Sequence, residues 1–271
     1  PRPQYGNRLI GSEPFLRATF SYDLPQLMSF SIPFGLYLGL VGLAGGAAFL
    51  FVQGIRADRH PWHHLMAFLV PAVTALSYIA MLFGQGVTVL PTGRVYYWAR
   101  WADAAFGATV LVLNTALIAL PRSSSRRGAL LAGLAAANVI TMVAGLFAGF
   151  STGPAAQWTW YFVGSGAYTA VLWMLFVRVP MQAQRQGVSS RRRRTFWTLA
   201  LLLIGVAMLY PVWWIATPLG MGLVDVSTAL LVFAVLDVLS KALYGMILVR
   251  VVRRIPEDER ETSSANRQGR R

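Results

Sequence analysis

The sequence predicts an all-α fold, a bundle of seven transmembrane helices in one domain. Three observations support this prediction: 56% of the 271 residues are hydrophobic, only 13% are charged, and the mean hydropathy is +0.53. The apolar residues are gathered in stretches of roughly 20, the length at which a helix crosses a hydrocarbon core about 30 Å thick. The chain contains no cysteine, which excludes disulfides and thiolate metal sites.

The first four helices are predicted at 27–54, 64–86, 96–120 and 128–150. Each is a long apolar run, and the runs are separated by segments rich in Gly, Pro, Ser and Arg, residues that interrupt helices. These segments are QGIRADRHP, GQGVTVLPTGR and PRSSSRRG, of which the second has room for a short hairpin. The first apolar run lacks a small-residue cleavage site, so we expect no removable signal peptide.

The last three helices are predicted at 157–178, 195–217 and 226–252, after STGPAAQ, RVPMQAQRQGVSSRRRR and TPLGMGLVD. Asp225 directly precedes the seventh helix and is predicted to cap it, because a carboxylate there accepts hydrogen bonds from free backbone N–H groups. The predicted organisation is an extracellular N-terminal segment over 1–26, a seven-helix domain over 27–254 and a cytoplasmic polar tail over 255–271.

The arginines are distributed unevenly between the two ends of the predicted bundle. With the helices alternating in direction, 18 arginines fall on one side and four on the other, and Arg100 lies inside the third helix. Arginine accumulates on cytoplasmic loops, so we expect an integral protein of the plasma membrane with its N-terminus outside and its C-terminus in the cytoplasm. The net charge of +14 then reflects topology and contact with the lipid bilayer, and no nucleic-acid site is predicted.

Four ionisable residues lie well inside the predicted helices, where charge is costly and usually functional. Asp237 and Lys241 are four residues apart on the seventh helix, and Arg100 and Asp103 are three apart on the third, so each pair shares one helix face. Because both helices run in the same direction, we expect Asp103 and Lys241 to meet near mid-membrane. Lys241 is the only lysine of the chain.

Two chemistries account for a single buried lysine, and the residues alone favour neither. Lys241 either stays an ammonium paired with carboxylates, in a structural role, or condenses with a carbonyl compound as a Schiff base. In the second case the protonated nitrogen still needs counter-ions, which Asp103 and Asp237 would supply. Arg100 would then offset the excess negative charge.

Several motifs, in order along residues 30–252, resemble the microbial rhodopsins, with a pattern most like that of bacteriorhodopsin. The seventh-helix motif LDVLSKALYGMIL resembles the retinal-attachment helix of that family, and YYWARWADAAF resembles its third helix. FLVPAVTALSYIAMLFG, TWYFVGSGAY and LYPVWWI resemble its second, fifth and sixth helices. The resemblance implies a buried chromophore pocket that holds all-trans retinal, bound covalently to Lys241 as a Schiff base.

The same resemblance implies roles for individual residues. Asp103 would accept the proton from the nitrogen of Lys241, Asp237 would be the second counter-ion, and Arg100 would organise the outer half. Tyr78 would hydrogen-bond near Asp237. The other residues assigned to the retinal site are Trp101, Gly107, Trp160, Tyr161, Ser165, Tyr210, Pro211, Trp214 and Ser240.

The chain departs from the family pattern at several positions. Asn114, eleven residues after Asp103, stands where the pumps often have a carboxylate that returns a proton, and an amide cannot donate one at useful pKa. We therefore expect the lysine nitrogen to regain its proton slowly, with Asn114 in the proton-uptake path. The outer proton-release pair is replaced by Leu219 and Ala229, a threonine by Gly107 and a buried aspartate by Asn138.

Two alanines, Ala104 and Ala207, stand where the family has the tryptophans that enclose the polyene. Either neighbours such as Trp101, Phe106 or Met208 refill the space, or the pocket holds something larger, or retinal sits loosely. Ser240 replaces an alanine beside Lys241, and its hydroxyl favours charge localised there. This predicts an absorption band at shorter wavelength than that of bacteriorhodopsin.

The most favoured function is a slow, light-driven outward proton pump, which is not an enzyme. The alternatives are a photosensory rhodopsin that signals to a transducer protein, and a retinoid-binding protein without transport. A homo-oligomer is left open. The histidines His60, His63 and His64 lack a matching carboxylate or thiol, so no metal site is predicted and they are assigned to the membrane interface or to solvent.

Overall fold

The structure is a computed structural model that describes residues 34–56, 60–121, 124 and 126–255. The predicted N-terminal segment 1–26, the predicted start of the first helix at 27–33, and residues 256–271 of the predicted tail over 255–271 lie outside the described residues. Within the described part, seven helical segments are long and apolar enough to cross a membrane, which confirms the predicted fold class.

The seven segments agree with the predicted positions to within a few residues at most ends. They are α3 (Phe34–Ile55), α4 (Pro61–Leu82), α5 (Ala99–Ala119), α6 (Arg127–Phe150), α7 with η1 and α8 (Pro154–Trp173, Met174–Arg178, Val179–Arg185), α9 with α10 (Ser190–Ala207, Leu209–Ala216), and α11 with η2 and α12 (Val226–Asp237, Val238–Leu243, Tyr244–Val252). The fifth segment differs most, because its helix continues to Arg185 instead of ending at 178.

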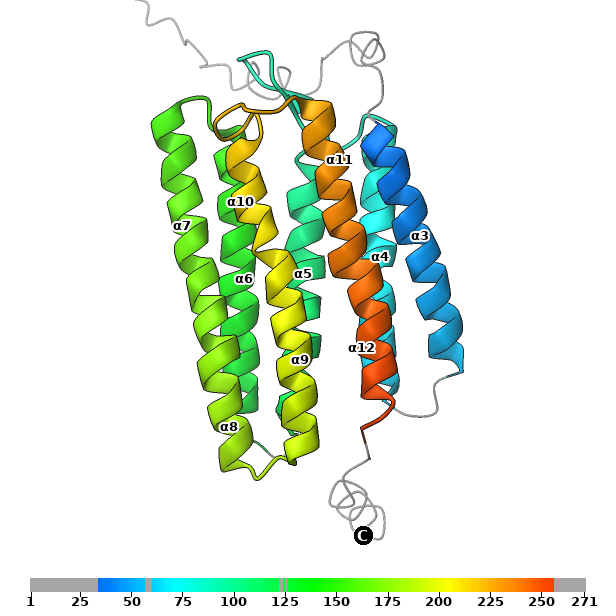
Figure 1. Ribbon diagram of the computed structural model, residues 1–271. Helices are drawn as coiled ribbons and strands as arrows, with labels where there is room; N and C mark the ends of the chain where they lie inside the picture. The colour runs from blue at the N-terminus through cyan, green and yellow to red at the C-terminus, as the bar shows by residue number, and fades with distance from the viewer. Residues whose placement is uncertain (1–33, 57–59, 122–123, 125, 256–271) are drawn as a thin grey trace, which may run out of the picture. The chain divides into compact units, whose positions relative to one another are not determined.

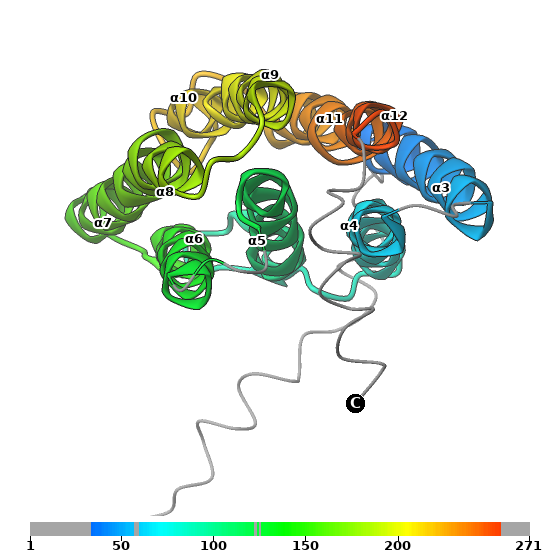
Figure 2. The ribbon, with the colours of Figure 1, turned by 90° about the horizontal axis from the view of Figure 1, so that it is seen from below.

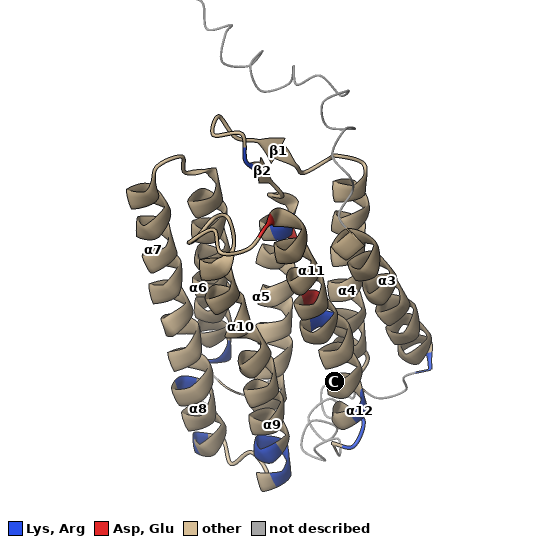
Figure 3. Cartoon of the chain, turned by 45° about the horizontal axis from the view of Figure 1, so that its top comes forward, with Lys and Arg blue, Asp and Glu red and all other residues tan. Residues whose placement is uncertain are grey.

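The segments stand side by side in two facing rows (Figures 1 and 2). Seen along the bundle, α7–α8, α9–α10, α11–α12 and α3 form a curved row, and α4, α5 and α6 form the row that faces it (Figure 2). Arginines gather where α8, α9 and α12 meet the connecting segments, and we call this the arginine-rich end (Figure 3). The opposite end, called the hairpin end, carries the antiparallel strands β1 (Thr88–Val89) and β2 (Val95–Tyr96).

Local sequence signals account for several helix starts. Proline stands at the first position of α4 (Pro61) and of α7 (Pro154), where its missing N–H has no helical partner to lose. Asp225 caps α11, because its carboxylate accepts hydrogen bonds from the backbone N–H groups of Ser227 at 3.0 Å and Thr228 at 3.4 Å. The predicted capping role of Asp225 is therefore confirmed.

Three irregular points were not predicted. The sixth segment is interrupted at Met208, between α9 and α10, and Pro211 explains this because a proline cannot donate the hydrogen bond that an α-helix requires four residues back. Two further segments, η1 and η2, are π-helical. A π-helical turn inside an α-helix is uncommon and is often found at a functional site; η2 contains Lys241.

Glycines on one side of α3 allow close helix packing. A Cβ atom at Gly35 would lie 2.7 Å from the backbone of Leu231, and one at Gly46 would lie 2.4 Å from Cβ of Ala242. Small residues at such spacing let transmembrane helices approach closely. The first helix is thereby held against α11 and η2, the segments that carry Asp237 and Lys241.

Candidate functional site

Lys241 lies between two carboxylates from different helices. Its Nζ atom is 2.7 Å from Oδ1 of Asp103 on α5 and 3.1 Å from Oδ1 of Asp237 at the end of α11. All three residues are buried, with Lys241 exposing only 4% of its surface. Asp103 and Lys241, which were expected to meet near mid-membrane, are therefore in direct contact.

Asp237 is surrounded by donors from three other segments. Tyr78 on α4 donates a hydrogen bond of 2.7 Å to its Oδ2 atom, and Tyr210 on α10 donates one of 2.9 Å to Oδ1. Arg100 forms an ion pair with Oδ2 at 3.2 Å. Because the carboxylate is held from four directions, counting Lys241, its position is strongly constrained.

Asp103 has fewer partners than Asp237. Thr74 on α4 donates a hydrogen bond of 3.1 Å to Oδ1, the same oxygen that contacts Lys241. The other oxygen, Oδ2, is buried and has no hydrogen-bond partner among the described residues. A carboxylate oxygen with free acceptor capacity beside an amine is well suited to receive a proton from it.

The four charges form one neutral cluster. Arg100 and Lys241 each carry one positive charge, and Asp103 and Asp237 each carry one negative charge, so burial of the set does not leave an uncompensated ion. Breaking such a pair by removing one member costs far more than losing a surface pair, because the remaining charge stays buried. The cluster therefore predicts strong effects of single substitutions.

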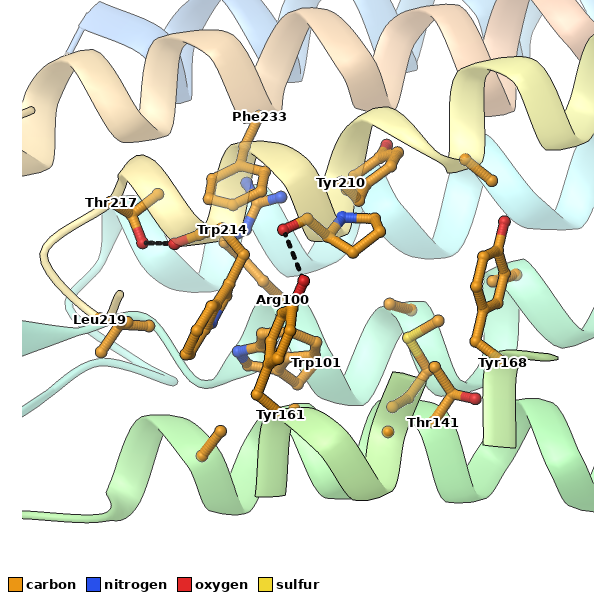
Figure 4. A pocket seen from close by; sticks show the side chains of 18 of the residues that line it. Arg100, Trp101, Thr141, Tyr161, Tyr168, Tyr210, Trp214, Thr217, Leu219 and Phe233 are labelled. Carbon is orange, nitrogen blue, oxygen red and sulfur yellow. Dashed lines mark hydrogen bonds between the residues drawn. The ribbon is translucent and has the colours of Figure 1, made fainter. Parts of the chain in front are cut away.

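A cavity of about 440 Å³ borders this cluster, reaching Lys241, Asp237 and Arg100. It is lined mainly by side chains from α5, α6, α7, α9, α10 and α11, and Figure 4 shows aromatic rings on several of its sides. Pockets of about 300–1,000 Å³ hold most drug-sized ligands. The cavity is therefore large enough for an elongated organic molecule with one end at Lys241.

The aromatic wall is ordered by specific contacts. The rings of Tyr161 and Trp214 stack with centroids 4.8 Å apart, and the Tyr161 hydroxyl donates a hydrogen bond of 3.4 Å to the backbone carbonyl of Pro211 (Figure 4). The guanidinium of Arg100 lies 4.3 Å from the ring centroid of Phe233, in a cation–π contact. These contacts join α5, α7, α10 and α11 around one end of the cavity.

Most of the residues assigned to the retinal site from the sequence line this cavity. Tyr78 and Asp103 belong instead to the ionic cluster, and Gly107 lies beside the Lys241 side chain, since a Cβ atom there would be 3.9 Å from Cε of Lys241. The predicted residues that line the cavity are Arg100, Trp101, Trp160, Tyr161, Ser165, Tyr210, Pro211, Trp214, Asp237, Ser240 and Lys241.

The two alanines also line the cavity. Ala104 and Ala207 border it, while Phe106 is 40% exposed and is not among the lining residues, so it does not refill the space. The Trp101 ring packs on α6, where a Cβ atom at Gly145 would lie 2.0 Å from Cζ3 of the indole. The other two candidates, Trp101 and Met208, both line the cavity.

Asn114 lies away from the cavity, toward the arginine-rich end, and contacts His63. Its Nδ2 atom donates a hydrogen bond of 3.2 Å to the backbone carbonyl of His63, and its Oδ1 atom bonds to Nδ1 of His63. His63 is partly buried and His64 is only 1% exposed. Solvent exposure was therefore the wrong expectation for His64, which packs inside the bundle, while His63 is turned toward Asn114; both lie in the first turn of α4.

Fold and site together define a class of protein: a seven-helix membrane protein in which a lysine held between two carboxylates lines an aromatic cavity. The family model of bacteriorhodopsin-like proteins matches residues 31–255. The chain therefore belongs to this family of microbial rhodopsins, whose chromophore is retinal.

Individual relatives and solved structures agree with this assignment. The chain is 32% identical to archaerhodopsin-2 of a Halobacterium species over 89% of its length and 93% of the relative's. It is 31% identical to bacteriorhodopsin-II of Haloarcula marismortui over 85% of its length and 92% of that protein's. The crystal structure of thermophilic rhodopsin from Rubrobacter xylanophilus superimposes with a TM-score of 0.76 at 30% identity, covering 81% of this chain and 95% of that one.

Proposed function

We propose that the protein is a light-driven outward proton pump in which Lys241 carries retinal as a Schiff base. The observation that carries the proposal is the position of the Lys241 Nζ atom, 2.7 Å from Asp103 and 3.1 Å from Asp237, on a residue that lines the cavity. A structural ammonium would need the carboxylates but not the cavity. The combination favours the covalent role over the structural one.

The residues present fit retinal in shape and chemistry. The cavity is lined mostly by apolar and aromatic side chains, it is about 440 Å³ in volume, and the amine of Lys241 is at its edge. An aldehyde condenses with an amine, and an apolar polyene is stabilised by burial against aromatic rings. Retinal bound here would supply the light absorption and the change of shape that starts the proton transfer.

The chain's own residues would then hold and move the proton. Asp237, fixed by Tyr78, Tyr210 and Arg100, stays ionised and keeps the positive charge at Nζ of Lys241 stable in the dark. Asp103, with its unpartnered Oδ2 atom, is the acceptor of the proton that leaves Nζ. Arg100 lies on the hairpin-end side of the cluster, and its positive charge offsets part of the negative charge of Asp103 and Asp237.

The direction of transport follows from the arginine distribution. We place the arginine-rich end in the cytoplasm and the hairpin end outside, because cytoplasmic loops carry the excess of arginine. Arg100 precedes Asp103 on α5, which starts at the hairpin end, so a proton that leaves Lys241 toward these residues moves outward.

Two measurements test the proposal. The protein, expressed in a bacterial membrane and supplied with all-trans retinal, should gain a visible absorption band that Lys241→Ala abolishes. Illumination of the cells should acidify the medium, and a protonophore should remove the effect. A missing band would overturn retinal binding, whereas a band without acidification would overturn transport alone.

The photosensory alternative is supported by one observation, the amide at Asn114 in place of a proton-donating carboxylate. A slow return of the proton extends the lifetime of the deprotonated state, which suits signalling. Net acidification under continuous light distinguishes the two functions, because a sensor returns the proton without sustained transport.

A further inference from the structure

His63 is the ionisable residue that meets Asn114 within the membrane. The two residues come from α4 and α5, are 51 positions apart, and bond to each other in both directions. Because Nδ2 of Asn114 donates to the backbone carbonyl of His63, Oδ1 is the amide atom that faces the imidazole ring. An amide oxygen only accepts hydrogen bonds, so Nδ1 of His63 carries a hydrogen and Nε2 is left to take up a proton.

Two hydrogen-bonded hydroxyl groups belong to residues that are close to Asn114 and to Lys241 in the chain. Thr115, the neighbour of Asn114, is within 2.5 Å of the Tyr244 hydroxyl, and both residues are buried. Tyr244 follows Lys241 by three residues and is the first residue of α12. Asn114 itself is about 16 Å from Asp103 along α5, so a proton path from this end needs such intermediate groups.

The described residues at the arginine-rich end contain histidines and arginines and no carboxylate. The described aspartates are Asp103, Asp225 and Asp237, and none of them lies at that end. The charged neighbours that act on His63 are His60, His64 and Arg192, and Arg253 on the far side of His64 donates to its Nε2 atom at 3.0 Å. Among these side chains, an imidazole is the group that can both take up and release a proton, which an amide or a guanidinium cannot do.

We propose that His63, oriented by Asn114, relays the proton that returns from the cytoplasm to Lys241. Nε2 takes up one proton from the cytoplasmic side, and the protonated ring gives one proton to the nitrogen of Lys241 that lost its own to Asp103. The ring is neutral before and after, and Asn114 holds the hydrogen on Nδ1 throughout. This relay rests on the proposed function, since it explains how Lys241 regains its proton in a chain that has Asn114 in place of a carboxylate.

Flash absorption of the retinal-bound protein tests the relay. His63→Gln keeps an amide N–H for Asn114 but cannot pass a proton through the side chain, so recovery of Lys241 should slow by about tenfold or more at every pH. Added imidazole should restore part of the rate. The matched control is His64→Gln, which should recover at the wild-type rate because His64 bonds to His60 and Arg253 and not to Asn114.

A second measurement is made without retinal. Nitrogen NMR of the retinal-free protein should show His63 with its hydrogen on Nδ1 at neutral pH, and Asn114→Leu should remove that preference. A hydrogen on Nε2 would overturn the assigned orientation.

The failures of the two proposals are distinguishable. If no visible band forms with retinal, the proposed function fails and the relay fails with it. If the band and the photocycle are intact and His63→Gln recovers as fast as wild type, the relay alone is wrong. Equal slowing in His64→Gln would also overturn it, because the effect would then belong to packing at this end.

Discussion

Gly39 on α3 lies so close to Tyr78 on α4 that a Cβ atom there would be 2.1 Å from Cε1 of the phenol ring. The ring is fully buried, and its hydroxyl donates the 2.7 Å hydrogen bond to Asp237. A helix that contributes no charge to the ionic cluster therefore sets the position of one of the groups that hold Asp237.

Gly39→Ala should displace Tyr78 and weaken its bond to Asp237. Overpacking of this kind costs about 1–3 kcal/mol, so we expect a lower melting temperature and a shifted visible band. Gly45→Ala is the matched control, because no atom lies within 4 Å of a Cβ added on that side of α3. Equal melting temperatures and spectra of the two variants would show that Tyr78 can move aside without losing its hydrogen bond to Asp237.

Asp103→Asn should stop proton transfer while leaving the chromophore bound. The amide cannot take a proton from Nζ of Lys241, and the loss of one negative charge 2.7 Å away moves the band to longer wavelength. Flash spectra should lack the deprotonated intermediate, and cells should no longer acidify the medium. Persistent formation of that intermediate would assign the acceptor role to Asp237.

Ser240→Ala should move the absorption band to longer wavelength. The Ser240 hydroxyl, 2.9 Å from that of Tyr210, belongs to the residue before Lys241 and favours positive charge near Nζ. Removing it lets the charge spread along the chromophore. Ser151→Ala, at a hydroxyl that bonds within its own helix at 2.8 Å, is the control that should leave the spectrum unchanged.

Ala207→Trp should narrow the cavity without closing it. The wild-type protein is expected to form pigments with retinal and with analogues that carry enlarged rings, because the lining residues Ala104 and Ala207 occupy less space than tryptophans would. The variant should bind retinal and reject the larger analogues. Leu201 lies on the outer surface of α9 and is 60% exposed, so Leu201→Trp should bind retinal and the larger analogues as wild type does. Loss of retinal binding in Ala207→Trp would place the chromophore against Ala207 itself.

Asp225→Ala should lower stability at neutral pH and have little effect in strong acid. Hydrogen bonds from Thr228 and Ser227 hold the pKa of the Asp225 carboxyl below its ordinary value of 3.8. Its contribution is therefore present above that ordinary value and is lost as the pH falls through the lowered one. Melting curves at pH 7 and at about pH 2 test this, and Asp225→Asn, which keeps an uncharged acceptor, should lack the pH dependence.

The sequence predicted the features that depend on one helix at a time. Apolar length placed seven helices, and spacing placed Asp237 and Lys241 on one face, because both follow from the regular geometry of a helix. The contact between Asp103 and Lys241 followed from the expected depth of each in the membrane. Asp225 was recognised because a cap is a local interaction.

Features that depend on contacts between distant segments were missed or left open. His63 was assigned to the membrane interface or to solvent because its partner Asn114 is 51 positions away on another helix. The signal that would have joined them is their similar depth near the arginine-rich end. Periodicity also does not show the single extra residue of a π-helical turn, so η2 was not predicted, and the outward direction of Phe106 depends on a rotation of α5 that composition does not fix.

The π-helical turn at η2 also limits how this chain tolerates insertions and deletions. The turn holds one more residue than an α-helical turn, so it shifts the angular phase between α11 and α12 by about 100°. With this shift, Asp237 faces Tyr78 and Tyr210 while Tyr244 faces Thr115. Deleting one residue from 238–243 would rebuild a regular helix, yet it would rotate one of these faces away from its partners.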